Sequence, residues 1–381
     1  MQPDEFRKHA HQVVDWISDY MENVGQYPVT PRLEPGAILQ SLPDAAPASG
    51  EAFEAIFADF EKLIVPGMTH WQHPAFFAYF PANASPASLL GEMLTSALGA
   101  QCMSWLTSPA ATELEQRVME WLRDLISLPP EFAGVIQDTA STATLCALLS
   151  ARERASGWGI NETGFQGQRY RIYASSEAHS SVEKAVRIAG LGSQNLVKVA
   201  VDENFAMIPA GLAAAIAADR AAGYEPLCVV AAWGTTGSTA LDPLAEIAAI
   251  CQRESLWLHV DAAYAGSALI LPEIRKLAQG LELADSLVFN PHKWLLTHFD
   301  CSAYFVRDPA ALERTFGLTP EYLKTDLDRQ VHNYRDWGIQ LGRRFRALKL
   351  WFVLRSYGVS GLQQFIRQQI AWVQELADEI Q

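Results

Sequence analysis

A lysine inside an apolar stretch is the first residue that could do chemistry. Residues 289–296 read FNPHKWLL, so Lys293 lies beside Trp294 and His292. Lysine is among the side chains that proteins bury least often. Two interpretations are open: the stem of Lys293 carries its charge to the surface, or its amine has a chemical task.

Four other polar segments each follow a short apolar run, as Lys293 does. DTASTAT (138–144) follows GVIQ, and His179 follows YRIYAS. GTTGST (234–239) follows LCVVAAW, and Asp261 ends LWLHVD. A carboxylate in such an apolar setting is costly unless it meets a cation. Small hydroxyl residues at a strand-to-helix turn suit a phosphate, but they also suit ordinary N-capping, and DTASTAT alone leaves both open.

Together the five segments supply a phosphate cradle, an imidazole, hydroxyls, a carboxylate and an amine. A zinc site from His259, Asp261 and His292 would place the Lys293 cation beside the metal, and no H-x-x-x-H pair supports it. A serine hydrolase would need a G-x-S-x-G turn, which the sequence lacks. Pyridoxal 5′-phosphate uses all five elements, since it needs a lysine, an anion for its ring nitrogen and a phosphate cup. We therefore expect this cofactor and no metal.

The pattern of apolar runs predicts how these segments meet. The runs that indicate strands are 134–137, 170–175, 196–201, 227–233, 256–262, 286–290 and 302–306. Helical patterns such as 180–191 and 242–254 lie between several of them, the second with Asp242 as its N-cap. This alternation predicts a mainly parallel seven-stranded sheet between helices. Ligands bind at the carboxyl ends of such strands, so the five segments should form one site.

The N-terminal part has a different pattern. Apolar residues recur at helical spacing over 6–20 and 53–63, with a proline-rich connector between them. These two helices make a poor domain alone, so the rest of the chain or a second subunit must cover their apolar faces. A helix at 108–125 has a clear start, with Ser108 as N-cap and Pro109 in its first turn.

The composition excludes several classes of function. The chain has 381 residues and a net charge of −14, which argues against nucleic acid or an anionic membrane as the main partner. Five scattered cysteines without a C-x-x-C pair indicate neither a disulfide scaffold nor a cysteine zinc site. No G-x-G-x-x-G follows the first strand, and no phosphate-binding G-x-x-x-x-G-K-[ST] occurs. A charged start and the lack of an apolar run of about 18 residues predict a cytoplasmic protein without a transmembrane helix.

Longer motifs make the sequence resemble a known family. These are PGMTHWQHPAFFAYFP (66–81), AHSSVEKA (178–185), WLHVDAAYAGSA (257–268), ADSLVFNPHKWLL (284–296), FDCSAYFV (299–306) and YRDWGIQLGRRFRALKLWFVLRSYGV (334–359). They are similar, in the same order, to segments of the aromatic-L-amino-acid decarboxylases, which are group II pyridoxal-phosphate-dependent decarboxylases. The resemblance implies the aspartate aminotransferase-like fold (fold type I) of pyridoxal-phosphate-dependent transferases. It also implies a homodimer.

The resemblance assigns roles to the strand-end residues. Lys293 matches the lysine that forms a Schiff base with the cofactor, and Asp261 matches the carboxylate paired with its ring nitrogen. His179 matches an imidazole stacked on the ring, and Ala263 packs on the opposite face. Thr236 matches a threonine near the phenolic oxygen and the substrate. The residues that match the phosphate cup are Thr139, Ala140, Ser141, Asn290 and His292.

One further catalytic residue comes from the resemblance alone. Tyr322 matches a tyrosine that returns a proton to the substrate carbon after CO2 leaves. Members with phenylalanine there tend toward oxidative aldehyde formation, so Tyr322 favours decarboxylation. Without the family, Tyr322 would be interpreted as a surface tyrosine in a helix.

The resemblance also implies a substrate pocket, part of which comes from the other subunit. The matching residues are Trp71, Tyr79, Phe80, Ala82, Met103, His179 and Gly342. The aromatic cluster disfavours an acidic substrate, and glycine at position 342 accompanies indole substrates in plant members. Met103 and Ala82 replace a phenylalanine and a threonine of the animal enzymes. Asp138 and Thr139 replace a glycine and a serine in the phosphate turn.

The implied domains are residues 1–85 as a helical segment that clasps the partner subunit, 86–350 as the cofactor-binding domain and 351–381 as the truncated start of a small C-terminal domain. The expected reaction converts tryptophan, dopa, tyrosine or phenylalanine to the amine and CO2. Three alternatives stay open: a decarboxylase of an acidic amino acid such as glutamate, an aromatic aldehyde synthase, and a structural dimer without cofactor.

Overall fold

The computed structural model describes residues 1–80, 84–318 and 330–380. The chain divides into two compact units, Met1–Ala82 and Asn83–Gln381. The domain boundaries expected at residues 85 and 350 stay predictions. None of the described helices is long and apolar enough to cross a membrane.

The first unit is helical, as its apolar spacing predicts. Its helices are α1 (Pro3–Asn23), α2 (Ala37–Ser41) and α3 (Phe53–Asp59), and a π-helical turn, Phe60–Ile64, continues α3. Trp16 of α1 packs edge-on against Phe60, with ring centroids 5.0 Å apart. No residue of α1 is fully buried, and Phe6, Val14 and Met21 stay exposed. The unit therefore leaves apolar side chains of α1 uncovered.

The second unit contains a seven-stranded sheet in the order β1-β7-β6-β5-β4-β2-β3. The strands are β1 (Ala133–Gln137), β2 (Tyr170–Ser175), β3 (Leu196–Val199), β4 (Glu225–Ala232), β5 (Trp257–Asp261), β6 (Ser286–Phe289) and β7 (Ser302–Val306). β7 runs antiparallel to both of its neighbours, and the other pairs are parallel. The prediction of a mainly parallel seven-stranded sheet is confirmed. The strands β1, β2, β4, β5 and β6 consequently end at one edge.

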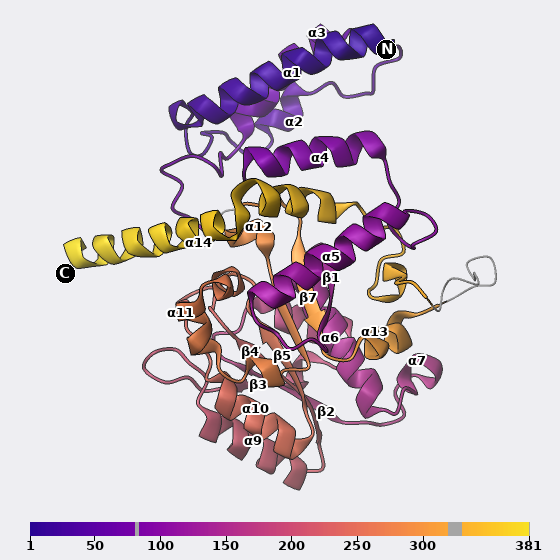
Figure 1. Cartoon of the computed structure of the whole chain (residues 1–381), viewed down its shortest axis with the longest axis vertical. Helices are drawn as coiled ribbons and strands as arrows, with labels where there is room; N and C mark the ends of the chain where they lie inside the picture. Colours follow the sequence, from indigo (N-terminus) through magenta and orange to yellow (C-terminus); the bar gives the residue numbers. More distant parts are fainter. Residues whose placement is uncertain (81–83, 319–329, 381) are drawn as a thin grey trace. The chain divides into compact units, whose positions relative to one another are not determined.

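Helices cover both faces of this sheet (Figure 1). The α-helices described in the second unit are α4 (Pro86–Leu98), α5 (Pro109–Leu125), α6 (Ala140–Ala155), α7 (Ile160–Thr163), α8 (Ser180–Ile188), α9 (Pro209–Ala221), α10 (Leu244–Glu254), α11 (Pro272–Arg275), α12 (Pro291–Trp294), α13 (Pro309–Phe316) and α14 (Arg346–Ile380). α5 starts after Ser108 with Pro109 in its first turn, as predicted. α14 has a kink at Gly358.

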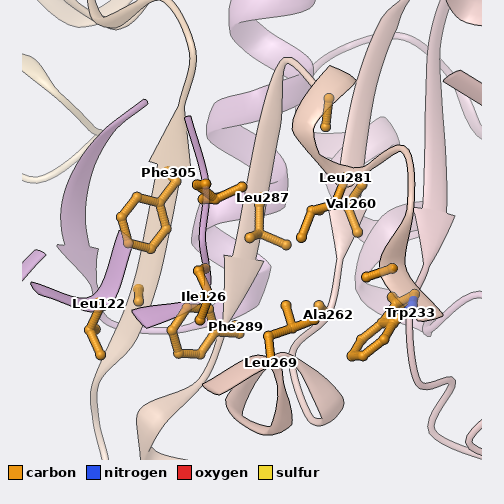
Figure 2. Packing of buried hydrophobic residues seen from close by; sticks show 14 of the residues in the cluster. Leu122, Ile126, Trp233, Val260, Ala262, Leu269, Leu281, Leu287, Phe289 and Phe305 are labelled. Atoms are coloured by element: carbon orange, nitrogen blue, oxygen red, sulfur yellow. The ribbon is translucent and has the colours of Figure 1, made fainter. Parts of the chain in front are cut away.

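Alternating side chains of the strands form two apolar cores. On one face, strand residues such as Leu287, Phe289 and Phe305 pack with α5, α9, α10 and α14. Figure 2 shows this core, with Leu122 and Ile126 beside the strand side chains. On the other face, strand residues pack with α6, α8 and α13. Both faces are buried, which explains the continuous apolar runs in the sequence.

Asp242 does not cap α10, so that prediction is wrong. The helix starts at Leu244 with Pro243 at the cap position. The Asp242 carboxylate instead accepts hydrogen bonds from the backbone N–H groups of Met207 and Ala232, both at 2.7 Å. Burial raises the pKa of Asp242 to about 6. The carboxylate satisfies buried amides of two separate segments, and a local capping pattern does not reveal such partners.

Candidate active site

A cavity of about 190 Å³ lies at the carboxyl ends of the strands. Every residue that the sequence proposed for cofactor binding lines it: Thr139, Ala140, Ser141, His179, Thr236, Asp261, Ala263, Asn290, His292 and Lys293. They come from turns that follow β1, β2, β4, β5 and β6. The fold thus brings the five polar segments together, while the role of each residue stays a prediction.

Lys293 and Asp261 face this cavity from neighbouring strand ends. Burial lowers the pKa of Lys293, and the Asp261 charge opposes this effect. Burial raises the pKa of Asp261, which the Ala263 N–H group (3.1 Å to Oδ1) and the charges of Lys293 and His179 oppose. A lowered pKa makes the amine more available for attack on an aldehyde. A buried carboxylate is stabilised by a cationic partner such as a protonated ring nitrogen.

The segment around Lys293 is fixed by packing on both sides. The Trp294 ring stacks on Tyr264 at 4.8 Å, with an interplanar angle of 8°. Leu295 and Leu296 are buried, and the Lys293 N–H group donates to the Asn290 carbonyl at 2.9 Å. The apolar neighbours that made Lys293 conspicuous in the sequence therefore hold its backbone in place.

Two histidines each present one ring nitrogen as an acceptor. His179 precedes α8, and its Nδ1 accepts from the Ser181 N–H group at 3.2 Å. His292 Nδ1 accepts from the Cys301 N–H group at 2.9 Å, and burial lowers the pKa of His292 to about 4. At neutral pH His292 is therefore uncharged, and its Nε2 carries the proton. That proton is available to a ligand oxygen.

The N-terminus of α6 forms one wall of the cavity. The Thr139 hydroxyl caps the helix by accepting from the Thr142 N–H group. The remaining first-turn N–H groups, at Ala140 and Ser141, have no partner within the helix and lie at its positive end. Capping and anion binding are therefore compatible in this turn, because they use different N–H groups.

Asn290 supports the same wall from the end of β6. Its Oδ1 accepts from the Ser302 hydroxyl at 2.7 Å, which fixes the orientation of the amide. Its backbone N–H donates to the Ala263 carbonyl at 2.9 Å. Asn290 thereby ties the turn that holds Lys293 to the turn that follows Asp261.

Gly234 allows the turn after β4 to approach the cavity closely. Its φ is +93°, and a Cβ there would stand 2.4 Å from the Ala265 Cβ. Only glycine fits without displacing the neighbouring backbone. Sequence reasoning missed six residues that line the cavity: Ser181, Ala232, Gly234, Thr235, Tyr264 and Phe299. Five of them lie within or beside the strand-end segments, so a wider window around each strand end would have found them, whereas Phe299 lies in the turn after α12.

Comparisons with known proteins agree with this geometry. The pyridoxal-dependent decarboxylase conserved domain matches residues 35–381. Aromatic-L-amino-acid decarboxylase of Bos taurus is 46% identical, over 97% of this chain and 78% of that protein. The chain belongs to the pyridoxal-dependent decarboxylase family. It is a carboxy-lyase whose cofactor is pyridoxal 5′-phosphate.

Solved structures of this decarboxylase family share the fold. Catharanthus roseus tryptophan decarboxylase in complex with L-tryptophan has a TM-score of 0.93 and 42% identity, over 99% of this chain and 80% of that one. Rhodiola rosea 4-hydroxyphenylacetaldehyde synthase has a TM-score of 0.92 and 38% identity, over 100% of this chain and 80% of that one. The similarity confirms the expected pyridoxal-phosphate fold.

The cavity fits the cofactor of the family. It combines an amine of lowered pKa, a buried carboxylate, a neutral histidine N–H group and the N-terminus of a helix. The amine matches the aldehyde of the cofactor, and the carboxylate matches its ring nitrogen. The histidine N–H group and the helix N-terminus match its phosphate.

The proposed substrate residues are divided between the two units. Trp71, Tyr79 and Phe80 lie in the first unit, where Trp71 and Tyr79 stack at 5.8 Å. Met103 and Gly342 lie in the second unit, but neither is among the described residues that line the cavity. Two predictions, Ala82 and Tyr322, fall outside the described residues.

The segments that carry Met103 and Gly342 are nevertheless hydrogen-bonded to each other. The Cys102 N–H group donates to the Arg343 carbonyl at 3.0 Å, and the Arg335 N–H group donates to the Met103 carbonyl at 2.9 Å. The Arg343 N–H group donates to Gln101 Oε1 at 2.7 Å. These bonds join two segments that are distant in the sequence.

Proposed function

We propose that this family member removes the carboxylate of an aromatic L-amino acid and releases the amine and CO2. The convergence of Lys293 and Asp261 on one cavity, beside the N-terminus of α6, carries the proposal. Pyridoxal 5′-phosphate, when bound, accepts the electron pair that the carbon–carboxylate bond releases. The named tryptophan and aromatic-amino-acid decarboxylases similar to this chain support an aromatic substrate.

Each residue predicted to act in catalysis or to bind the cofactor has a proposed task. Lys293 holds the cofactor through its aldehyde and is displaced by the substrate amine. Asp261 keeps a proton on the ring nitrogen, and His179 contacts the ring face opposite Ala263. Tyr322 returns a proton to the substrate carbon. The phosphate is held by Thr139, Ala140, Ser141, Asn290 and His292, and Thr236 contacts the phenolic oxygen and the substrate.

An aromatic side chain suits the cavity better than an acidic one. Among the described residues that line the cavity, Lys293 is the sole lysine or arginine, and its amine is committed to the aldehyde. A glutamate side chain would therefore find no charged partner there. Gly342 supports an indole substrate through the resemblance, because glycine at this position accompanies indole substrates in plant members.

A second copy of the chain is part of the proposal. Met103 and Gly342 lie on hydrogen-bonded segments and are not among the residues that line the cavity, which fits a role of these segments in the pocket of a partner subunit. The α4 helix exposes Leu90 (53%), Leu94 (48%) and Leu98 (63%), which supports an apolar contact with that partner. Sedimentation of the purified protein tests this: a monomer at all concentrations would contradict it.

A cytoplasmic location is also part of the proposal. All five cysteines are buried and free of disulfides, which is what a reducing compartment favours.

Product analysis tests the reaction. We expect amine and CO2 when tryptophan, dopa, tyrosine, phenylalanine and glutamate are offered together with the cofactor. Amine from glutamate alone would refute the aromatic assignment. Lys293→Ala is the matched control, and it should keep the far-UV circular dichroism spectrum of the wild type while losing turnover.

The aromatic aldehyde synthase is a second candidate, because one of the similar solved structures has that activity. The same reaction mixture discriminates, since aldehyde formation also releases ammonia and consumes oxygen. Tyr322→Phe should shift the products from amine toward aldehyde. Aldehyde as the main wild-type product would replace the proposed function with this one.

A further inference from the structure

Asp138 places a carboxylate directly before the helix that forms the cavity wall. It lies between β1 and α6, one residue before the N-cap Thr139. Its Oδ1 accepts from the Thr139 N–H group at 2.6 Å and from the Thr139 hydroxyl at 3.3 Å. Its Oδ2 accepts from Gln340 Nε2 at 3.2 Å. An internal anion thus occupies a donor in the turn that is proposed to hold the cofactor phosphate.

The cavity offers little positive charge to balance this carboxylate. His292 is neutral at neutral pH, because burial lowers its pKa to about 4. Asp261 places a carboxylate in the cavity wall itself. Arg346 interacts electrostatically with Asp138, but its guanidinium donates to the Asp300 carboxylate at 2.8 and 3.4 Å, which is the stronger interaction. Lys293 is the sole lysine or arginine among the described lining residues, so the phosphate depends on the helix N-terminus and neutral donors.

We infer that Asp138 weakens the affinity of the chain for the phosphate of its cofactor. It does so in two ways: it holds the Thr139 N–H group, and it places a negative charge beside the positive end of α6. The family pattern that the sequence resembles has glycine at this position, so this chain has a carboxylate where that pattern has none. Asp138 acts on the phosphate through the turn and is a positioning residue. The inference rests on the proposed function, because it needs the phosphate at this turn.

Equilibrium dialysis of the full chain, first freed of bound cofactor, against pyridoxal 5′-phosphate tests the inference. Asp138→Asn keeps an acceptor oxygen for the Thr139 N–H group and removes the charge. We expect its Kd for the cofactor to fall at least tenfold, which corresponds to about 1.4 kcal/mol. Asp124→Asn is the matched control, because Asp124 is an exposed carboxylate that pairs with Arg123, and its Kd should equal that of the wild type.

Two further readouts isolate the charge and the phosphate. Pyridoxal, which lacks the phosphate, should bind wild type and Asp138→Asn equally. The ratio of the two cofactor Kd values should shrink as salt rises from about 0.01 to about 1 M, where screening shortens from about 30 to about 3 Å. Asp138→Gly, checked for folding by circular dichroism, should bind the cofactor at least as tightly as Asp138→Asn.

The outcomes separate the inference from the proposed function. An unchanged or raised cofactor Kd in Asp138→Asn would overturn the inference alone. Equal gains for pyridoxal and for the phosphorylated cofactor would also overturn it, because the effect would not act on the phosphate. If wild type and both variants fail to bind the cofactor, the proposed function fails.

Discussion

The buried ion pair between Arg343 and Glu115 joins the 335–343 segment to α5. Arg343 Nη2 lies 2.5 Å from Glu115 Oε1 and donates to the Ile136 carbonyl at 2.9 Å. Glu115 Oε1 also accepts from the Ile136 N–H group at 2.9 Å. The side chains are only 6% and 3% exposed. The pair therefore connects the segment that carries Gly342 with the end of β1, just before the cofactor cavity.

Removing only the arginine should be strongly destabilising. In Arg343→Met the Glu115 carboxylate stays buried and keeps a single N–H donor from Ile136. Loss of one partner from a buried pair costs about 3–5 kcal/mol in the free energy of unfolding. The double variant Glu115→Gln with Arg343→Met removes both charges, so it should recover more than half of that loss.

Urea unfolding followed by tryptophan fluorescence measures these free energies. Arg343 also orders Gln101 and Met103 through the backbone bonds of its segment, so the single variant should raise KM for the amino acid more than it raises the Kd of the cofactor. A loss below about 1 kcal/mol in Arg343→Met would refute the argument that the pair is buried and coupled. A double variant less stable than the single one would refute it as well.

Two further predictions concern acid stability and the cavity wall. His259 is fully buried and its pKa is lowered to about 3, so the folded state keeps it neutral while the unfolded state binds a proton below pH 6.5. The free energy of unfolding therefore decreases as pH falls from 6.5 toward 3, by about 2 kcal/mol at pH 5. In thermal unfolding, His259→Asn should lose less stability than the wild type between pH 7 and 5. An equal loss of stability in both proteins would contradict this. Gly234→Ala should raise the cofactor Kd at least tenfold, because its new Cβ would stand 2.4 Å from that of Ala265, and an unchanged Kd in equilibrium dialysis would contradict the described packing.

Much of the fold and of the cofactor cavity could be predicted from the sequence. Strands buried on both faces give continuous apolar runs, and the polar residues after them mark the edge where ligands bind. Lys293 and Asp261 stood out because each is costly in an apolar run unless it has a partner. These signals are local, so one sequence was enough to find them.

Other features depend on contacts that are distant in the sequence. The carboxylate of Asp242 bonds to Met207 and Ala232, and its position before a proline suggested a helix cap instead. The pairing of the segments that carry Met103 and Gly342 depends on backbone bonds. Phe299 lines the cavity through a turn after α12, with no periodicity that indicates it. Tertiary packing decides these contacts, and local patterns do not.

The central claim is that the amine of Lys293 binds the cofactor aldehyde. Borohydride reduction of the protein with pyridoxal 5′-phosphate, followed by peptide mass spectrometry, tests it most directly. The account predicts that the peptide containing Lys293 carries the reduced cofactor, and that Lys293→Ala carries none. A label on another lysine, or an unlabelled wild type, would contradict it.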